Sequence, residues 1–155
     1  MNYNGIQIID NKIHNYGDPK KVKDVIKRFG INNKYILTVG TLNPHKNYLR
    51  LIETFSHLNR ENLTLVIVGQ DRGYGKILKQ RVSKLELDDK IFFLENIEDI
   101  ILKILYKNAL IFVYPSLYEG FGIPLLEAMY YKIPIACSNI NIFKEISGNS
   151  VAYFN

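Results

Sequence analysis

The segment YEGFGIPLLEA, residues 118–128, carries two carboxylates, Glu119 and Glu127, eight positions apart. Pro124 between them suits the first turn of a helix, because its missing N–H would have no partner there. The backbone amides of residues 122–125 are then expected to point out of the helix end. A helix N-terminus of this kind attracts anions, since free N–H groups and the helix dipole both favour negative charge.

Two glycines in the same segment, Gly120 and Gly122, allow a backbone to approach a ligand without a Cβ in the way. Carboxylates accept hydrogen bonds from sugar hydroxyls, and the helix end offers amides to a phosphate. A nucleotide sugar contains all the matching groups, namely ribose, diphosphate and hexose. An isolated pair of glutamates at this spacing is common by chance, so a loop glutamate and a solvated helix glutamate remain the alternative for the pair alone.

Several other site types find no support in the sequence. The opening strand runs into GTLNPHKN instead of G-x-G-x-x-G, and Leu78 stands where RGYGKIL would need its third glycine. There is no phosphate-binding G-x-x-x-x-G-K-[ST] loop and no G-x-S-x-G nucleophile elbow. His14, His45, His57 and Cys137 show no ligand spacing, so no metal site is predicted. No cofactor is expected.

The composition is that of one soluble globular domain of 155 residues, with 47% hydrophobic and 23% charged residues. A formal net charge of +5 suits an anionic partner. The excess is concentrated near the N-terminus, where a solvated helix face is the favoured interpretation and a phosphate-rich or membrane surface the alternative. The basic residues there are Lys20, Lys21, Lys23, Lys27 and Arg28.

The single cysteine, Cys137, lies in an apolar run and is predicted to be a small core residue, which favours a reducing, cytoplasmic setting. The N-terminus lacks the basic and apolar regions of a signal peptide, and no apolar run reaches the length of a membrane span.

Short apolar runs alternate with amphipathic stretches from residue 35 onward, which predicts alternating strands and helices. Most of these runs are apolar throughout, as expected for strands covered on both faces. The predicted strands are 35–40, 63–69, 90–94, 110–115, 133–138 and 150–154, and the predicted helices are 46–59, 74–85, 98–108, one starting near Pro124, and 141–147.

This alternation predicts an α/β fold: a doubly wound, Rossmann-like, three-layer domain with a mostly parallel sheet of about six strands. Ligands bind such sheets at the carboxyl ends of the strands, where both the 118–128 segment and GTLNPHKN fall. Residues 1–30 are interpreted as a linker followed by a leading helix over 18–29, with Asp18 as its N-cap, and residues 31–155 as the nucleotide-sugar-binding domain.

The string YPSLYEGFGIPLLEAM resembles the E-x7-E signature of the family 4, or group 1, retaining glycosyltransferases. The resemblance covers roughly residues 31–155. LTVGTLNPHKNYLRLIETFSHL is similar to that family's first strand, phosphate loop and helix, and IPIACSNINIFKEISGNSVAYF to its closing βαβ unit. In that family these parts form the C-terminal, donor-binding half of a GT-B fold.

The resemblance implies a role for each matching residue in binding a nucleoside-diphosphate sugar and transferring its hexose. Lys46 would neutralise the charge that builds on the leaving diphosphate, and Glu119 would lie at the donor sugar; both are the catalytic candidates. Glu127 would bind the ribose diol. The other implied donor-binding residues are Gly40 and Thr41 in the phosphate loop, His45 beside Lys46, Ile97 against the base, and Gly120, Phe121, Gly122 and Ile123 at the helix end.

Two departures from the family pattern leave a non-catalytic or degenerate nucleotide-binding module open as the alternative. The family commonly has an arginine at one of the positions that Thr41 and His45 occupy here; a protonated His45 would replace part of that charge. The acceptor-binding domain and the last helices of the family are also expected to be absent, which would leave half an active site, inactive on its own.

The partners implied by the resemblance are a nucleotide sugar, an acceptor glycan or lipid-linked sugar, and a separate acceptor-binding domain. No nucleic-acid partner is expected. The basic N-terminal segment suggests peripheral contact with anionic lipid, which would place the protein at the inner membrane surface.

Overall fold

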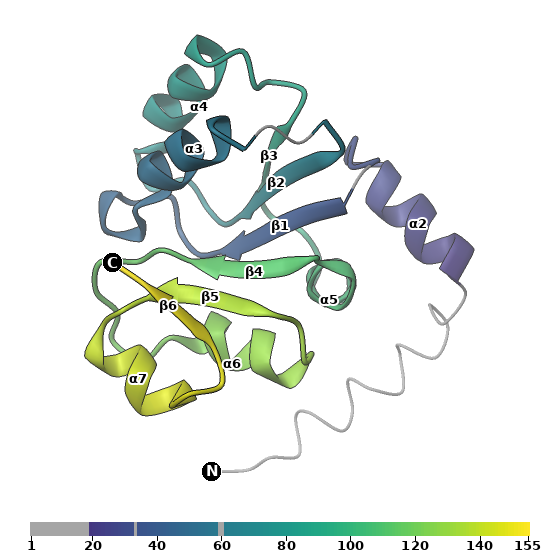
Figure 1. Cartoon of the computed structure of the whole chain (residues 1–155). Helices are drawn as coiled ribbons and strands as arrows, with labels where there is room; N and C mark the ends of the chain where they lie inside the picture. The colour runs from purple at the N-terminus through teal and green to yellow at the C-terminus, as the bar shows by residue number, and fades with distance from the viewer. Residues whose placement is uncertain (1–18, 33, 59–60) are drawn as a thin grey trace.

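The computed structural model describes residues 19–32, 34–58 and 61–155. The predicted linker at 1–17 and the N-cap Asp18 lie outside these residues. The described part contains a six-stranded sheet of order β3-β2-β1-β4-β5-β6, in which every pair of neighbours is parallel (Figure 1). The predicted doubly wound α/β fold is confirmed, and the sheet is wholly rather than mostly parallel.

The six strands fall within two residues of their predicted ends. They are β1 (Lys34–Val39), β2 (Leu63–Val68), β3 (Ile91–Leu94), β4 (Ile111–Tyr114), β5 (Ile135–Ser138) and β6 (Ala152–Phe154). All six residues of β2 are buried, as expected of a strand with helices on both faces. The order of the strands reverses between β1 and β4, which are parallel neighbours in the sheet, so the loops that follow them diverge at a topological switch point.

The helices likewise match the amphipathic stretches. They are α2 (Pro19–Lys27), α3 (Tyr48–Ser56), α4 (Gly75–Lys84), α5 (Asp99–Asn108), α6 (Ile123–Tyr130) and α7 (Asn141–Ser147). One prediction needs correction: the helix expected over 46–59 is divided. A 3₁₀ turn, η2 (Pro44–Lys46), comes first, and Asn47 at φ 58° separates it from α3. Lys46 therefore lies in a tight turn and not at an α-helix start.

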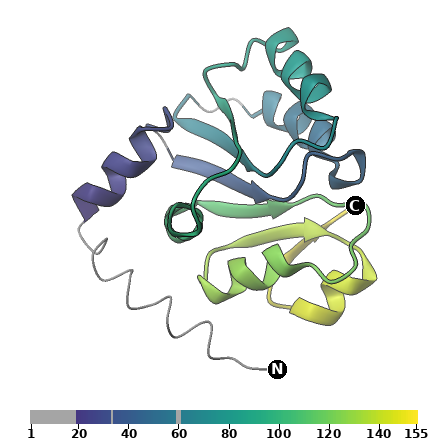
Figure 2. The same ribbon diagram turned by 180° about the vertical axis from the view of Figure 1, so that it is seen from behind.

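Two apolar cores lie on opposite faces of the sheet. One contains Tyr48, Ile52 and Phe55 of α3 packed on β2, together with residues of α4. The other is built from α2, α5, α6 and α7 against the opposite sides of β1, β2, β4 and β5. Figures 1 and 2 show the two sets of helices on either side of the strands. On the first face the helices accompany β1–β3 and leave the side chains of β4–β6 less covered.

The loops that follow β1 and β2 are held against each other by their backbones. Gly40 N–H donates to the Val68 carbonyl at 2.8 Å, and Leu42 N–H donates to the Gln70 carbonyl at 2.8 Å. A Cβ at Gly69 would overlap the Gly40 carbonyl, so the two loops could not lie this close with a larger residue there. The loop after β2 thus fixes the position of the loop that leads from Gly40 to η2.

The amphipathic α2 packs Val25 and Ile26 into the core while Lys23 and Lys27 remain exposed. Cys137 is fully buried, as predicted, and burial raises the pKa of its thiol to about 11. Among the described residues, no helix is both long and apolar enough to cross a membrane.

Candidate functional site

The loops that follow β1 and β4 meet at the carboxyl edge of the sheet. Leu117 N–H donates to the His45 carbonyl at 2.8 Å. The His45 ring stacks on Tyr118, with ring centroids 4.7 Å apart and planes 25° apart. These contacts make His45 half-buried. They also bring the residues that follow His45 and Tyr118 face to face.

Those residues are Lys46 and Glu119, which form an ion pair with Nζ and Oε1 2.5 Å apart. Their side chains are only 10% and 11% exposed, so neither charge is solvated. The ammonium also lies 5.3 Å from the centroid of the Tyr114 ring and 3.4 Å from its hydroxyl. A Cβ at Gly40 would lie 3.2 Å from Lys46 Cε, so the glycine leaves room for the lysine stem.

Glu119 is ionised in this setting. Burial by itself raises the pKa of its carboxyl, but the hydrogen bond from Lys46 and the neighbouring hydroxyls of Ser116 and Tyr114 outweigh burial and lower it below the ordinary value of 4.5. The Ser116 hydroxyl is buried and makes no hydrogen bond within the described part of the chain. Burial, and then the charge of Glu119, raise the pKa of Tyr114, whose phenol therefore remains a donor.

The N-terminus of α6 lies directly after this pair. Gly122 caps the helix at φ 79°, a conformation that glycine adopts without strain. A Cβ there would come within 3.2 Å of Phe143, so packing on α7 also requires this glycine. Gly120 faces open space, which leaves its backbone accessible.

The expectation of free amides across 122–125 was too broad. Pro124 has no N–H, and Leu125 N–H donates to the Gly122 carbonyl at 2.9 Å. Within the described part of the chain, the amides of Phe121, Gly122 and Ile123 donate to no acceptor. The side chains of Phe121 and Ile123 are exposed. The amides that this helix end leaves without an acceptor are therefore those of residues 121–123.

Glu127 lies one turn into α6 and is held by a buried tyrosine of α5. The Tyr106 hydroxyl donates to Glu127 Oε2 at 2.8 Å. Burial, followed by the charge of Glu127, raises the pKa of Tyr106, so its phenol remains protonated and continues to donate. One carboxylate oxygen of Glu127 is thus held by Tyr106, and the side chain as a whole is half-buried.

Two other predicted donor-binding residues, Thr41 and Ile97, form no hydrogen bond within the described residues to Lys46 or to either glutamate of the site. Thr41 lies in the loop after β1, where its hydroxyl accepts from the Asn43 side-chain amide at 3.1 Å. Ile97 is half-buried and packs against the core shared with α5. That packing agrees with a core role, and the assignment of Ile97 to a nucleotide base stays a prediction.

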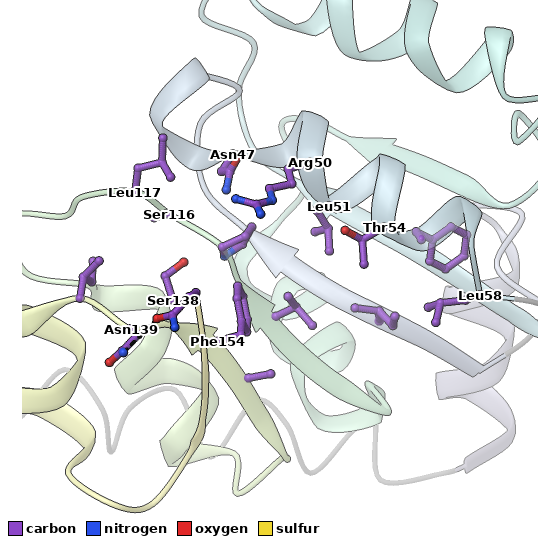
Figure 3. A pocket seen from close by; sticks show the side chains of 17 residues that line it. Asn47, Arg50, Leu51, Thr54, Leu58, Ser116, Leu117, Ser138, Asn139 and Phe154 are labelled. Carbon is purple, nitrogen blue, oxygen red and sulfur yellow. Dashed lines mark hydrogen bonds between the residues drawn. The ribbon is translucent and has the colours of Figure 1, made fainter.

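A hollow of about 560 Å³ lies beside this site on the less covered face of the sheet (Figure 3). In Figure 3, Asn47, directly before α3, and Arg50 of α3 face Ser138 and Asn139 across it. Its lining includes Ser116 but neither catalytic candidate nor Glu127. The hollow is therefore distinct from the polar site at the α6 N-terminus.

The sequence did not point to Tyr114 and Ser116, which lie beside the Lys46–Glu119 pair, or to Tyr106, which donates to Glu127. Tyr114 ends β4, and Tyr106 lies among aliphatic residues of α5; both are fully or almost fully buried. A phenol in an otherwise aliphatic run was the available signal, because a buried tyrosine hydroxyl needs a polar partner. Among the described residues, no three acidic, histidine or cysteine side chains gather as a metal site would require.

The assembled groups suit a phosphorylated sugar. A buried cation is paired with one carboxylate, three free backbone amides follow at the α6 N-terminus, and a second carboxylate lies one turn into α6. Residues 20–154 match the family model described as glycosyl transferases group 1. The chain belongs to this family. The match also includes α2.

Curated relatives of this glycosyltransferase chain include the O-antigen chain mannosyltransferase RfbU of Salmonella typhimurium, 41% identical over 121 residues. That alignment covers 78% of this chain and 34% of RfbU. The O-antigen chain mannosyltransferase B of Escherichia coli is 32% identical, with 97% of this chain and 42% of that protein covered. The glycosyltransferase chain thus spans between a third and a half of the length of these relatives.

Among solved structures, Anabaena Alr3699/HepE in complex with UDP and glucose superposes with a TM-score of 0.77 at 22% identity. The superposition covers 89% of this chain and 39% of that one. At this level of identity the likeness establishes the shared fold.

Proposed function

We propose that this chain is the donor-binding domain of a hexosyltransferase that uses a nucleoside-diphosphate sugar. The observation that carries the proposal is the buried Lys46–Glu119 pair, which lies directly before the free amides of the α6 N-terminus. Neither group has a structural reason to be buried there, since a buried ion pair is on balance a weak source of stability. Their position at the switch point is where doubly wound sheets bind ligands.

Each group has a specific task in this proposal. Lys46 and the amides of residues 121–123 bind the diphosphate and stabilise the negative charge that develops on it as the C1–O bond breaks. Glu119 accepts hydrogen bonds from the hydroxyls of the donor sugar. Glu127, oriented by Tyr106, accepts from the ribose diol. No residue of the set requires a metal ion for these tasks.

Mannose is the sugar that the relatives support, because both O-antigen enzymes are described as mannosyltransferases. We further propose transfer with retention of configuration to a surface glycan or lipid-linked sugar. The acceptor would be held by a separate acceptor-binding domain. The exposed lysines of α2 could add contact with anionic lipid at the cytoplasmic membrane surface.

A binding module without turnover is the second candidate, and the residues at the phosphate loop favour it. Thr41 and His45 occupy the positions where an additional fixed positive charge would strengthen the diphosphate site. The His45 ring is instead stacked on Tyr118. Nucleotide binding without sugar transfer, measured with an acceptor-binding domain supplied, would favour this candidate.

Calorimetric titration of the chain with UDP, GDP and ADP tests donor binding. We expect one of the three to bind more tightly than the others, because a site that hydrogen-bonds one base leaves groups unpaired with another. Inorganic pyrophosphate should bind more weakly than that nucleotide but through the same cation. Absence of heat with all four compounds, from a chain shown to be folded by circular dichroism, contradicts the proposal.

A further inference from the structure

Lys46, the cation proposed to bind phosphate, already forms an ion pair with a carboxylate of the same chain. Lys46 and Glu119 are 2.5 Å apart, and both are almost completely buried. Because the pKa of Glu119 is lowered, the carboxylate is charged at neutral pH. A phosphate that approaches Lys46 therefore also approaches a negative charge.

That carboxylate cannot easily move away. Its loop is pinned to η2 by the hydrogen bond from Leu117 N–H to the His45 carbonyl and by the stacking of Tyr118 on His45. The Tyr114 hydroxyl lies 3.4 Å from Lys46 Nζ beside this pair, and the Tyr114 ring is itself stacked on Phe143 with centroids 4.8 Å apart. The negative charge is a fixed part of the site.

Free nucleoside diphosphate and nucleotide sugar differ at the group that faces this charge. The sugar-linked phosphate carries a neutral hexose, whose hydroxyls can donate to a carboxylate. In transfer, the bond between sugar C1 and the phosphate oxygen breaks and the oxygen keeps both electrons. The acceptor hydroxyl forms the new bond to C1 and releases its proton to solvent. The product phosphate thus gains negative charge beside Glu119.

We propose that Glu119 is a specificity-determining residue that favours the nucleotide sugar over the free nucleoside diphosphate. It repels the terminal phosphate of the product and accepts hydrogen bonds from the sugar of the donor. The same carboxylate then promotes release of the product once the sugar has left. This inference rests on the proposed function, since it requires the diphosphate to bind at Lys46.

Calorimetry on the Glu119→Gln variant tests the inference with inorganic pyrophosphate, UDP, GDP, UDP-glucose and GDP-mannose. We expect pyrophosphate and the preferred nucleoside diphosphate to bind about tenfold more tightly than to the unmodified chain, a change of about 1.4 kcal/mol. The matching nucleotide sugar should bind no more tightly than before. The double variant Lys46→Met/Glu119→Gln should lose the gain, because the gain requires the lysine.

Glu53→Gln is the matched control, because Glu53 of α3 forms an ion pair with Arg81 of α4 at 3.0 Å, and the two side chains are about 40% exposed. Its phosphate binding should equal that of the unmodified chain. Thermal unfolding establishes that each variant is folded, and Glu119→Ala, which also removes the charge, replaces Glu119→Gln should the latter not fold.

The outcomes separate this inference from the proposed function. Pyrophosphate binding to the unmodified chain that is unchanged or weakened in Glu119→Gln overturns the role of Glu119 and leaves the donor site standing. An equal gain in affinity of Glu119→Gln for the nucleoside diphosphate and for the nucleotide sugar also overturns it. The carboxylate would then not discriminate between these two ligands. Binding of no phosphate compound by either chain removes the donor site and this inference together.

Discussion

Lys46→Met should lose both nucleotide and pyrophosphate binding and should also destabilise the fold. A charge-assisted hydrogen bond to phosphate contributes about 1.5–3 kcal/mol, so the affinity should fall by at least tenfold. Removing one partner of a buried ion pair costs about 3–5 kcal/mol of unfolding free energy, because the other charge remains buried and unpaired. Calorimetry measures the first effect and urea unfolding the second.

The stability loss of Lys46→Met should depend on pH. In the unmodified chain the pKa of Glu119 is lowered, so its charge contributes stability above pH 4.5 that is lost as the pH falls through the lowered value. Without the ammonium, burial raises the pKa of this carboxyl, and protonation then stabilises the folded state. The difference in unfolding free energy between the unmodified chain and Lys46→Met should therefore become smaller as the pH falls from 7 toward 4.5.

Two further variants separate binding from stability. Lys79→Met removes an exposed pair, with Lys79 Nζ 3.8 Å from Glu95, and should cost less than about 1 kcal/mol. Lys46→Met/Glu119→Gln removes both buried charges and should recover most of the stability without recovering phosphate binding. Full phosphate affinity in Lys46→Met would contradict the role given to this lysine.

Glu127→Ala should weaken nucleotide binding by about 1–3 kcal/mol, the usual result of leaving a hydrogen-bonded group without its partner. Pyrophosphate affinity should stay the same, because Glu127 is assigned to the ribose and not to the phosphates. Lys46→Met should instead weaken binding of both compounds, so the comparison of the two variants distinguishes ribose recognition from phosphate recognition. Calorimetric titration with the preferred nucleotide and with pyrophosphate measures it.

Tyr106→Phe is the matched variant for Glu127, because it removes only the hydroxyl that donates to Glu127 Oε2 at 2.8 Å. It should weaken nucleotide binding less than Glu127→Ala does, since the carboxylate remains but is no longer held. Tyr35→Phe removes a different buried phenol, which donates to the Leu105 carbonyl, and should leave nucleotide affinity unchanged. Equal nucleotide affinity in Glu127→Ala and the unmodified chain would rule out ribose recognition by this glutamate.

The fold was predictable because its signals are local. Continuous apolar runs such as LTLVIV gave strand positions, and spacings of three and four gave the helices. The meeting of Lys46 and Glu119, 73 positions apart, also followed from a general rule, since both come after strands of a parallel sheet.

The detailed contacts of the site were not predictable, because they depend on side chains from elements far apart in the sequence. No residue near Glu119 in the sequence indicates that its carboxylate pairs with Lys46. Nor does the sequence indicate that the Tyr114 hydroxyl lies beside this pair. The link between Tyr106 and Glu127 joins two helices. The division of the helix at Asn47 depends on a left-handed conformation that the sequence pattern alone did not signal. These contacts determine which amides and oxygens are left for a ligand.

The proposed donor site is tested most directly by mapping the diphosphate on the folded chain through amide chemical shifts. With the preferred nucleoside diphosphate at saturation, we expect the largest shifts at Thr41, Lys46 and residues 120–123. The hollow beside α3, with Arg50, Ser138 and Phe154 in its lining, should change little. Shifts confined to that hollow, with none at Lys46 or the α6 N-terminus, would contradict diphosphate binding at Lys46.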